Sequence, residues 1–340
     1  MPSALAKINQ SVWEDYLQAQ DARLPALRPI ERLSSRVIRV LGGNAGLMRL
    51  QGTNTYIIGT GESRLLVDTG QGEPFWIDHV KKVLEELGLA ISAVLLTHWH
   101  SDHTGGVPDL IAYRPELAHQ IYKCDPDRGQ KGITDGQVFH VEGATVRAVF
   151  TPGHAHDHMC FKLDEENVLF TGDNVLGHGQ TVFEDLGLFT KSLDIMANLH
   201  CQLGYPAHGD VLRDLPSKMR EVVKQKQYRE RQIYQGLVYS KADAAQQAGS
   251  DGGRGKGKGS LAIPALVRLL YGEVEPEVYK LAIEPSVSCT LAKLAEDRKV
   301  GFEMVGGEKC WFVRENRTSR ITTRRIGEKR ASSNNIAVTH

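Results

Sequence analysis

Residues 91–106 read ISAVLLTHWHSDHTGG, and this stretch decides the fold. Its first six residues, 91–96, form an unbroken apolar run rich in aliphatic residues, which is typical of a strand buried on both faces. Thr97 therefore begins a loop at the end of that strand. The loop carries four side chains that can bind a metal ion, in the spacing HxHxDH: His98, His100, Asp102 and His103.

The HxHxDH loop predicts a metal site. Its first two histidines lie two residues apart and can point the same way, while Asp102 and His103 follow on the turn. One loop can therefore offer ligands to two adjacent ions. Imidazole nitrogens with a carboxylate oxygen suit Zn²⁺ best, with Mn and Fe as alternatives. The competing interpretation is a histidine-rich surface turn without metal, which the position directly after a buried strand disfavours.

HxHxDH resembles the signature of the metallo-β-lactamase superfamily, and this resemblance implies where the other ligands lie. The third histidine of the first site corresponds to His154 in TPGHAHDH, although His156 and His158 are near enough to compete. The carboxylate that bridges the metals corresponds to Asp173 in VLFTGDNVLG, and the last histidine to His208 in YPAHGD. Two zinc ions per chain are thus implied, with the ligands His98, His100, Asp102, His103, His154, Asp173 and His208.

The distribution of histidines supports a metal site. Eleven of the 13 histidines fall between residues 98 and 208, a window of less than a third of the chain. Such clustering is hard to explain without metal. Asp68, which ends another strand in LLVDTG, is expected to orient a ligand and not to bind the metal itself.

Composition places the chain among ordinary globular proteins. Its 340 residues suffice for one large domain and a smaller one, and its 41 basic and 41 acidic residues cancel, so no long-range field attracts nucleic acid or anionic membrane. The five cysteines show no CxxC pairing and are expected to be free thiols. With neither a signal peptide nor an apolar run of about 18 residues, we expect a soluble, cytoplasmic protein without a membrane partner. The oligomeric state cannot be read from the sequence.

Residues 1–213 are predicted to form an α/β catalytic domain, an αββα sandwich. The apolar patterns favour a strand at 37–41, a hairpin of 55–58 and 64–68, and a helix from Pro74 to Gly88. Residues 3–20 have helical spacing; they are expected to pack outside the first sheet, or alternatively to cover the site as a flap. The remaining predicted elements are helices at 106–113 and 188–199 and strands at 120–124, 137–141, 144–150 and 168–170.

Residues 214–313 are predicted to form a small helical, winged-helix-like cap. A long charged helix begins the cap, and the glycine-rich residues 249–260 are expected to be a flexible loop. Helices at 263–271, 276–283 and 287–297 and a hairpin at 301–313 follow. Residues 314–340 are expected to be a disordered basic tail, with RNA contact as the alternative.

Several segments closely resemble the thioesterases of this superfamily that work beside nonreducing polyketide synthases, among them LLTHWHSDHTGGVPDL and FTGDNVLGHGQTVFEDL. The resemblance implies hydrolysis of the acyl carrier protein thioester of a polyketide, releasing atrochrysone carboxylic acid. The partner would be the polyketide-loaded acyl carrier protein domain of such a synthase. The absence of a cysteine ligand, found in some true β-lactamases of the superfamily, argues against antibiotic hydrolysis.

The expected chemistry relies on a metal-bridging hydroxide, because coordination lowers the pKa of water from about 15.7 towards about 7. Asp102, a ligand with a free second oxygen, is the expected catalytic proton donor and acceptor. Asn174, Gly177 and His178 are expected either to line the substrate pocket or to shape the turn after Asp173.

Three other functions stay open. A single-strand RNA endonuclease of the superfamily is one, but only 34 residues separate Asp173 from His208, too few for the inserted domain of the larger RNA nucleases. We therefore do not expect nucleic acid as a partner. A glyoxalase-type hydrolase of a glutathione thioester is the second, because it also hydrolyses a thioester. A purely docking protein is disfavoured by the complete ligand set.

Overall fold

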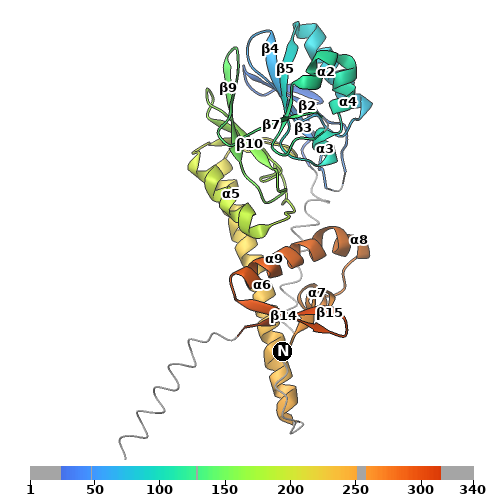
Figure 1. The fold of residues 1–340 in the computed structure, drawn as a ribbon, viewed down its shortest axis with the longest axis vertical. Helices are drawn as coiled ribbons and strands as arrows, with labels where there is room; N and C mark the ends of the chain where they lie inside the picture. The colour runs from blue at the N-terminus through green and yellow to red at the C-terminus, as the bar shows by residue number, and fades with distance from the viewer. Residues whose placement is uncertain (1–23, 47, 128, 251–257, 315–340) are drawn as a thin grey trace, which may run out of the picture.

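The computed structural model describes residues 24–46, 48–127, 129–250 and 258–314. The predicted helix at 3–20 and the tail beyond residue 314 lie outside the described residues. Two β-sheets pack face to face, with helices on both outer faces (Figure 1). The predicted αββα sandwich is therefore confirmed.

The first sheet has the strand order β1-β2-β3-β4-β5-β6-β7. Neighbouring strands from β1 to β4 are antiparallel, and those from β4 to β7 are parallel. The predicted hairpin and the strand before the HxHxDH loop are confirmed as β3, β4 and β5. The bounds are β1 Ile30–Arg32, β2 Val37–Leu41, β3 Asn54–Ile58, β4 Ser63–Val67, β5 Ala90–Leu95, β6 Ile121–Lys123 and β7 Lys131–Gly132.

The second sheet has the order β12-β11-β10-β9-β8, antiparallel except for the parallel pair β11 and β12. Its strand β10 was not expected, because the short segment MCFKL follows the polar segment TPGHAHDH directly. The bounds are β8 Val138–Val141, β9 Ala144–Phe150, β10 Met159–Leu163, β11 Val168–Gly172 and β12 Leu203–Pro206.

Helices cover the outer faces of both sheets. The helix α2, Pro74–Leu87, begins with a proline and ends at Gly88, whose left-handed φ of 62° suits a residue without a side chain. The short helices α3 (Ser101–Thr104), α4 (Val107–Tyr113) and η1 (Pro115–His119) follow β5. On the other side of the sandwich lie α5, Leu186–Asn198, and the first half of α6, Leu215–Ser250.

Alternating burial along the strands builds three core layers. In β4, Leu65 and Val67 face the opposite sheet, while Leu66 faces α2. In β11, Phe170 belongs to the layer between the sheets and Leu169 packs towards α5 and α6. Because both faces of these strands are covered, their sequences are apolar without a break, as expected for central strands.

The C-terminal part of the described chain has a core of its own, below the sandwich in Figure 1. It packs Leu237 of α6, Leu266, Leu291 and Trp311 together. The strands β13, β15 and β14 form its sheet in that order. The predicted hairpin at 301–313 is confirmed.

The bounds are β13 Leu261–Ala262, α7 Ile263–Tyr271, α8 Pro276–Val278, η2 Tyr279–Ile283, α9 Glu284–Glu296, β14 Val300–Val305 and β15 Glu308–Val313. The likeness to a winged helix stays a prediction, as do the domain boundaries.

The structure corrects the bounds of two predicted features of the cap. The helix α6 continues to Ser250, so the predicted flexible loop does not begin at residue 249, because the preceding KADAAQQA is rich in helix formers. Residues 251–257 of that loop lie outside the described residues. The helices predicted at 276–283 and 287–297 form one run from α8 to α9, joined by the π-helical turn η2. Pro285, two residues after the end of that turn, has no N–H to donate, and a wider turn accommodates this loss.

Among the described residues, none of the helices combines the length and the apolar character that crossing a bilayer requires.

A substitution at Gly106 tests how tightly the HxHxDH loop packs against the first sheet. A Cβ atom at this position would lie 2.1 Å from the Thr69 carbonyl oxygen and 2.5 Å from the Trp76 ring. We expect Gly106→Ala to lower the free energy of unfolding by on the order of 1–3 kcal/mol through overpacking, measured by urea denaturation. Gly132→Ala is the control, because its Cβ would meet nothing closer than 3.9 Å. Equal stabilities of the two variants would contradict the packing.

Candidate metal centre

The predicted ligands lie at the carboxyl ends of strands from both sheets. The HxHxDH loop follows β5, and the other three residues follow β9, β11 and β12. These last three strands run in the same direction, so their carboxyl ends share one edge of the sandwich. All seven belong to groups of donor atoms within 4.8 Å of one another: His98, His100, Asp102, His103, His154, Asp173 and His208.

Three imidazole nitrogens form the first group. The His98 Nε2 atom lies 2.8 Å from His100 Nδ1 and 3.2 Å from His154 Nε2, and the latter two nitrogens are 3.0 Å apart. Nitrogens bound to one tetrahedral Zn²⁺ at about 2.0–2.1 Å lie roughly 3.4 Å apart. Small outward movements would thus fit this triangle to one ion.

Asp173 stands between the first group and a second one. Its Oδ2 atom is 3.5 Å from His154 Nε2 and 3.6 Å from His103 Nε2, while its Oδ1 atom is 3.4 Å from His208 Nε2. The Asp102 Oδ2 atom lies 3.3 Å from His208 Nε2 and 3.6 Å from His103 Nε2. One carboxylate therefore faces both groups, as the predicted bridging residue must.

Hydrogen bonds on the outer side of two rings fix the tautomers of His154 and His208. The Nδ1 atom of His154 lies 2.8 Å from the Val182 carbonyl oxygen, and that of His208 lies 3.2 Å from the Gly52 carbonyl oxygen. Because a carbonyl oxygen only accepts, each Nδ1 carries the proton and each Nε2 lone pair points into the cluster.

Asp68 has the orienting role that the sequence predicted. Its Oδ2 atom accepts a hydrogen bond from His103 Nδ1 at 2.8 Å, and its Oδ1 atom accepts from the Thr97 backbone at 2.8 Å. The Thr97 hydroxyl donates to the same carboxylate and lies 2.9 Å from His98 Nδ1. Asp68 therefore orients two imidazoles and is not part of the cluster itself.

The donor set fits a pair of cations. The buried atoms His103 Nε2, His208 Nε2 and Asp173 Oδ1 have no hydrogen-bond partner among the described residues. Unpaired polar atoms in a dry site are costly, and they persist where another group satisfies them. Imidazoles and carboxylates are also the donor types that zinc prefers.

Electrostatics divides the histidines into two classes. Burial lowers the pKa of His98 and His100, and lowers that of His154 to about 4, so their rings are neutral as a metal ligand must be. Burial also opposes the charge on His103, but nearby carboxylates, Asp173 foremost, outweigh it and raise its pKa. A positive charge is therefore favoured between Asp173, Asp102 and Asp68, whether protons or a cation carry it.

Asp102 is ionised at neutral pH. Burial alone would raise the pKa of its carboxyl, but His103 and His208 outweigh that effect and lower it to about 2. Its side chain is 18% exposed, against 10% for Asp173 and 1% for His208. Asp102 is thus the carboxylate of the cluster with the better access to solvent.

The histidines that competed with His154 lie elsewhere. His156 is exposed and pairs with Asp125 and Glu184. His158 is buried, and its Nε2 atom accepts a hydrogen bond from the Asp173 backbone at 3.0 Å. His158 therefore supports the loop of the bridging carboxylate, a role that sequence reasoning missed.

Residues 52 and 53, directly before β3, contact the cluster and its loop. The Thr53 hydroxyl donates to the Asp102 carbonyl oxygen at 2.9 Å. The turn after Asp173 has a structural role at two of its three predicted pocket positions. Asn174 is fully buried, and its amide donates to the Thr151 carbonyl oxygen, while the Gly177 backbone donates to that of His208. Pocket lining by His178 stays a prediction.

Comparison with known proteins decides the family. The sequence profile described as "Metallo-beta-lactamase superfamily" matches residues 48–119 and 111–208. The lactamase-like protein aptB of Emericella nidulans is 58% identical over 309 residues, which cover 91% of this chain and 97% of that protein. The chain belongs to the metallo-β-lactamase superfamily.

Other members of the superfamily agree in sequence or in fold. A protein of Aspergillus chevalieri named atrochrysone carboxyl ACP thioesterase is 54% identical over 305 residues, covering 90% of this chain and 96% of its own. The solved structure of a β-lactamase domain protein from Burkholderia ambifaria shares the fold, with a TM-score of 0.67 at 15% identity over 85% of this chain and 96% of that chain. Superfamily membership makes this chain an enzyme of the hydrolase type, and together with the cluster it supports a metal cofactor.

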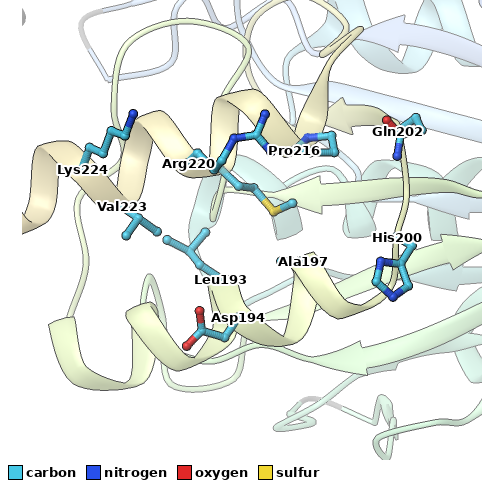
Figure 2. Close-up of a pocket in the computed structure, with 10 residues that line it drawn as sticks. Leu193, Asp194, Ala197, His200, Gln202, Pro216, Arg220, Val223 and Lys224 are labelled. Carbon is cyan, nitrogen blue, oxygen red and sulfur yellow. The ribbon is translucent and has the colours of Figure 1, made fainter.

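A separate groove lies between α5 and α6. It has a volume of about 530 Å³, and Leu193, Ala197 and Val223 line it together with Arg220 and Lys224 (Figure 2). None of the seven clustered residues lines it. The groove is therefore not part of the candidate metal centre.

The low pKa of His154 predicts a pH dependence of stability in protein treated with a chelator. The folded state keeps this ring neutral down to about pH 4, whereas the unfolded chain binds the proton below about pH 6.5. Stability is thus present above pH 6.5 and is lost as the pH falls towards 4. Between pH 7 and pH 4, wild type should lose on the order of 3 kcal/mol more than His154→Gln, measured by urea denaturation. His156→Gln is the matched control and should parallel wild type; a parallel curve for His154→Gln would refute the assignment.

Proposed function

We propose that this chain is a metal-dependent thioesterase that hydrolyses the acyl carrier protein thioester of a polyketide. The observation that carries the chemistry is the cluster in which one carboxylate, Asp173, faces two groups of inward-pointing imidazole nitrogens. The substrate class is supported by the Aspergillus chevalieri relative, whose name states an atrochrysone carboxyl ACP thioesterase. The partner would then be the loaded acyl carrier protein domain of a polyketide synthase, and the product atrochrysone carboxylic acid.

In this proposal the cluster holds two zinc ions. His98, His100 and His154 would hold the first, Asp102, His103 and His208 the second, and Asp173 would bridge them. Zinc held by these residues would supply a water nucleophile at neutral pH and polarisation of the thioester carbonyl. The outer hydrogen bonds of the rings keep the inner lone pairs in position, which lowers the cost of assembling the site.

Asp102 is the proposed proton carrier of the reaction. Its pKa of about 2 makes it a carboxylate at neutral pH, and its exposure exceeds that of Asp173, so its oxygen can take a proton from the attacking water. The water oxygen forms the new C–O bond as the C–S bond breaks. The proton then passes from Asp102 to the leaving thiolate, whose parent thiol has a pKa of about 8.5, so little acid assistance is needed.

The first test is the metal content. We expect about two zinc ions per chain in purified wild type, and about one in His208→Gln, because that change removes a donor from the second group only. Mass spectrometry of the native protein and elemental analysis measure both. Chelation should abolish hydrolysis, and adding back Zn²⁺, Mn²⁺ or Fe²⁺ separately identifies the metal. Wild type without any bound metal would overturn the proposed centre.

The second test is the reaction itself. Asp102→Asn removes the proton-accepting oxygen but keeps the shape of the side chain, and we expect hydrolysis to fall by about 10²–10⁴-fold. The assay follows free thiol and free carboxylic acid from a polyketide thioester on an acyl carrier protein. Asp78→Asn on α2 is the control, because its side chain is 71% exposed.

Parallel substrates separate the proposed function from its rivals. A glutathione thioester and single-stranded RNA should each react far more slowly than the carrier-bound polyketide. Fast cleavage of RNA with no release of the polyketide would contradict the proposed thioesterase and support an endonuclease. Equal rates on both thioesters would support thioester hydrolysis but contradict an acyl carrier protein as the specific partner.

A further inference from the structure

Residues 181–184 form a strap between the metal centre and the helices below it. On one side the strap holds His154, whose Nδ1 atom lies 2.8 Å from the Val182 carbonyl oxygen and 2.9 Å from the Thr181 hydroxyl. The Glu184 backbone also donates to the Gly153 carbonyl oxygen at 2.7 Å. The position of the strap therefore decides where the His154 ring points.

On its other side the strap is held by Lys226 of α6. The Lys226 Nζ atom donates to the Thr181 carbonyl oxygen at 3.1 Å. The same nitrogen lies 4.5 Å from the centre of the Phe183 ring and 5.6 Å from that of Phe189. A chain of two contacts thus runs from a helix through Thr181 to a predicted metal ligand.

Lys226 is an unusual residue to bury. It is 5% exposed, and burial holds the pKa of its amine well below the ordinary value. Among the described residues no carboxylate pairs with it, so its polar partner is the Thr181 carbonyl oxygen, and the Phe183 and Phe189 rings lie beside the amine. An apolar side chain would fill this space at lower cost. The hydrogen bond to Thr181 is what a lysine adds here.

A second helix holds the strap from the C-terminal part of the chain. The Cys289 thiol of α9 lies 3.4 Å from the Phe183 carbonyl oxygen and 3.3 Å from the Glu184 carbonyl oxygen. Contacts from α6 and α9 therefore meet on the four residues that hold His154.

We propose that Lys226 is a positioning residue for the metal centre, which fixes the strap at Thr181 and thereby sets the orientation of the His154 imidazole. This inference rests on the metal centre of the proposed function. It adds that α6, which also builds the core of the cap, determines how well the first group of ligands binds its ion.

Lys226→Met tests the inference, because methionine keeps the apolar stem and removes the donor. Lys224→Met is the matched control: it is the same change two residues away on α6, where the side chain is exposed (Figure 2). The readouts are zinc affinity, by competition with a chromophoric chelator, and the visible absorption spectrum of the Co²⁺-substituted protein. Neither readout depends on activity.

We expect Lys226→Met to weaken one of the two zinc equivalents by about tenfold, the lower end of the effects seen for groups that orient ligands. The other equivalent should stay within twofold of wild type, since His154 belongs to one group only. The Co²⁺ spectrum should also change, because one of the two binding sites changes its geometry. Lys226→Arg keeps a donor and should recover most of the affinity, and Lys224→Met should behave as wild type.

Thr181→Val gives a second route if Lys226→Met does not fold. It removes the hydroxyl beside His154 and should weaken the same equivalent. In the double variant the two effects should combine to less than their product, because both act through the strap.

Two results would overturn the inference in different ways. If wild type binds two zinc ions and Lys226→Met binds both equally well while losing thermal stability, Lys226 is structural and the proposed function stands. A uniform weakening of both equivalents would also remove the positioning role. If wild type binds no metal, the proposed function itself fails.

Discussion

The structure depends on placing five imidazoles and two carboxylates in one largely buried space at the edge of the sandwich. The buried rings must turn a lone pair inward, and their outer N–H groups must find acceptors, because a buried polar group without a partner is costly. Those acceptors come from distant parts of the chain, including Asp68, Gly52 and Val182. The hydrogen bonds to the rings therefore also fix the loops that carry these acceptors.

Close approach of backbone to ring is the second requirement. Gly172 has a left-handed φ of 51°, and a Cβ there would lie 2.4 Å from His158 Nε2, the atom that accepts from the Asp173 backbone. A side chain at Gly172 would thus displace the support of the bridging carboxylate. Charge works with this geometry, since the carboxylates raise the pKa of His103, while His103 and His208 lower the pKa of Asp102 and keep it ionised.

The sandwich and the cap share the helix α6 and also meet at the strap, which the Cys289 thiol of α9 contacts. The 36 residues of α6 pack on the second sheet with Met219 and Val222 and enter the cap core with Ile233 and Leu237. Lys226 lies between these two regions. Its amine contacts the strap and the strap contacts His154, so under the proposed positioning role a change in the cap would affect the metal centre through these hydrogen bonds.

Local pattern was enough to predict most of the strands, the glycine that ends α2, and the HxHxDH ligands after an apolar run. The sequence indicated His154, Asp173 and His208 only through its resemblance to the superfamily. It did not distinguish His154 from His156 and His158, which share one short polar segment. Nor did it single out Lys226, which looks like any lysine of a charged helix. Only the tertiary structure decided these, because the direction of a ring or an amine depends on acceptors that lie far away in the chain and close in space.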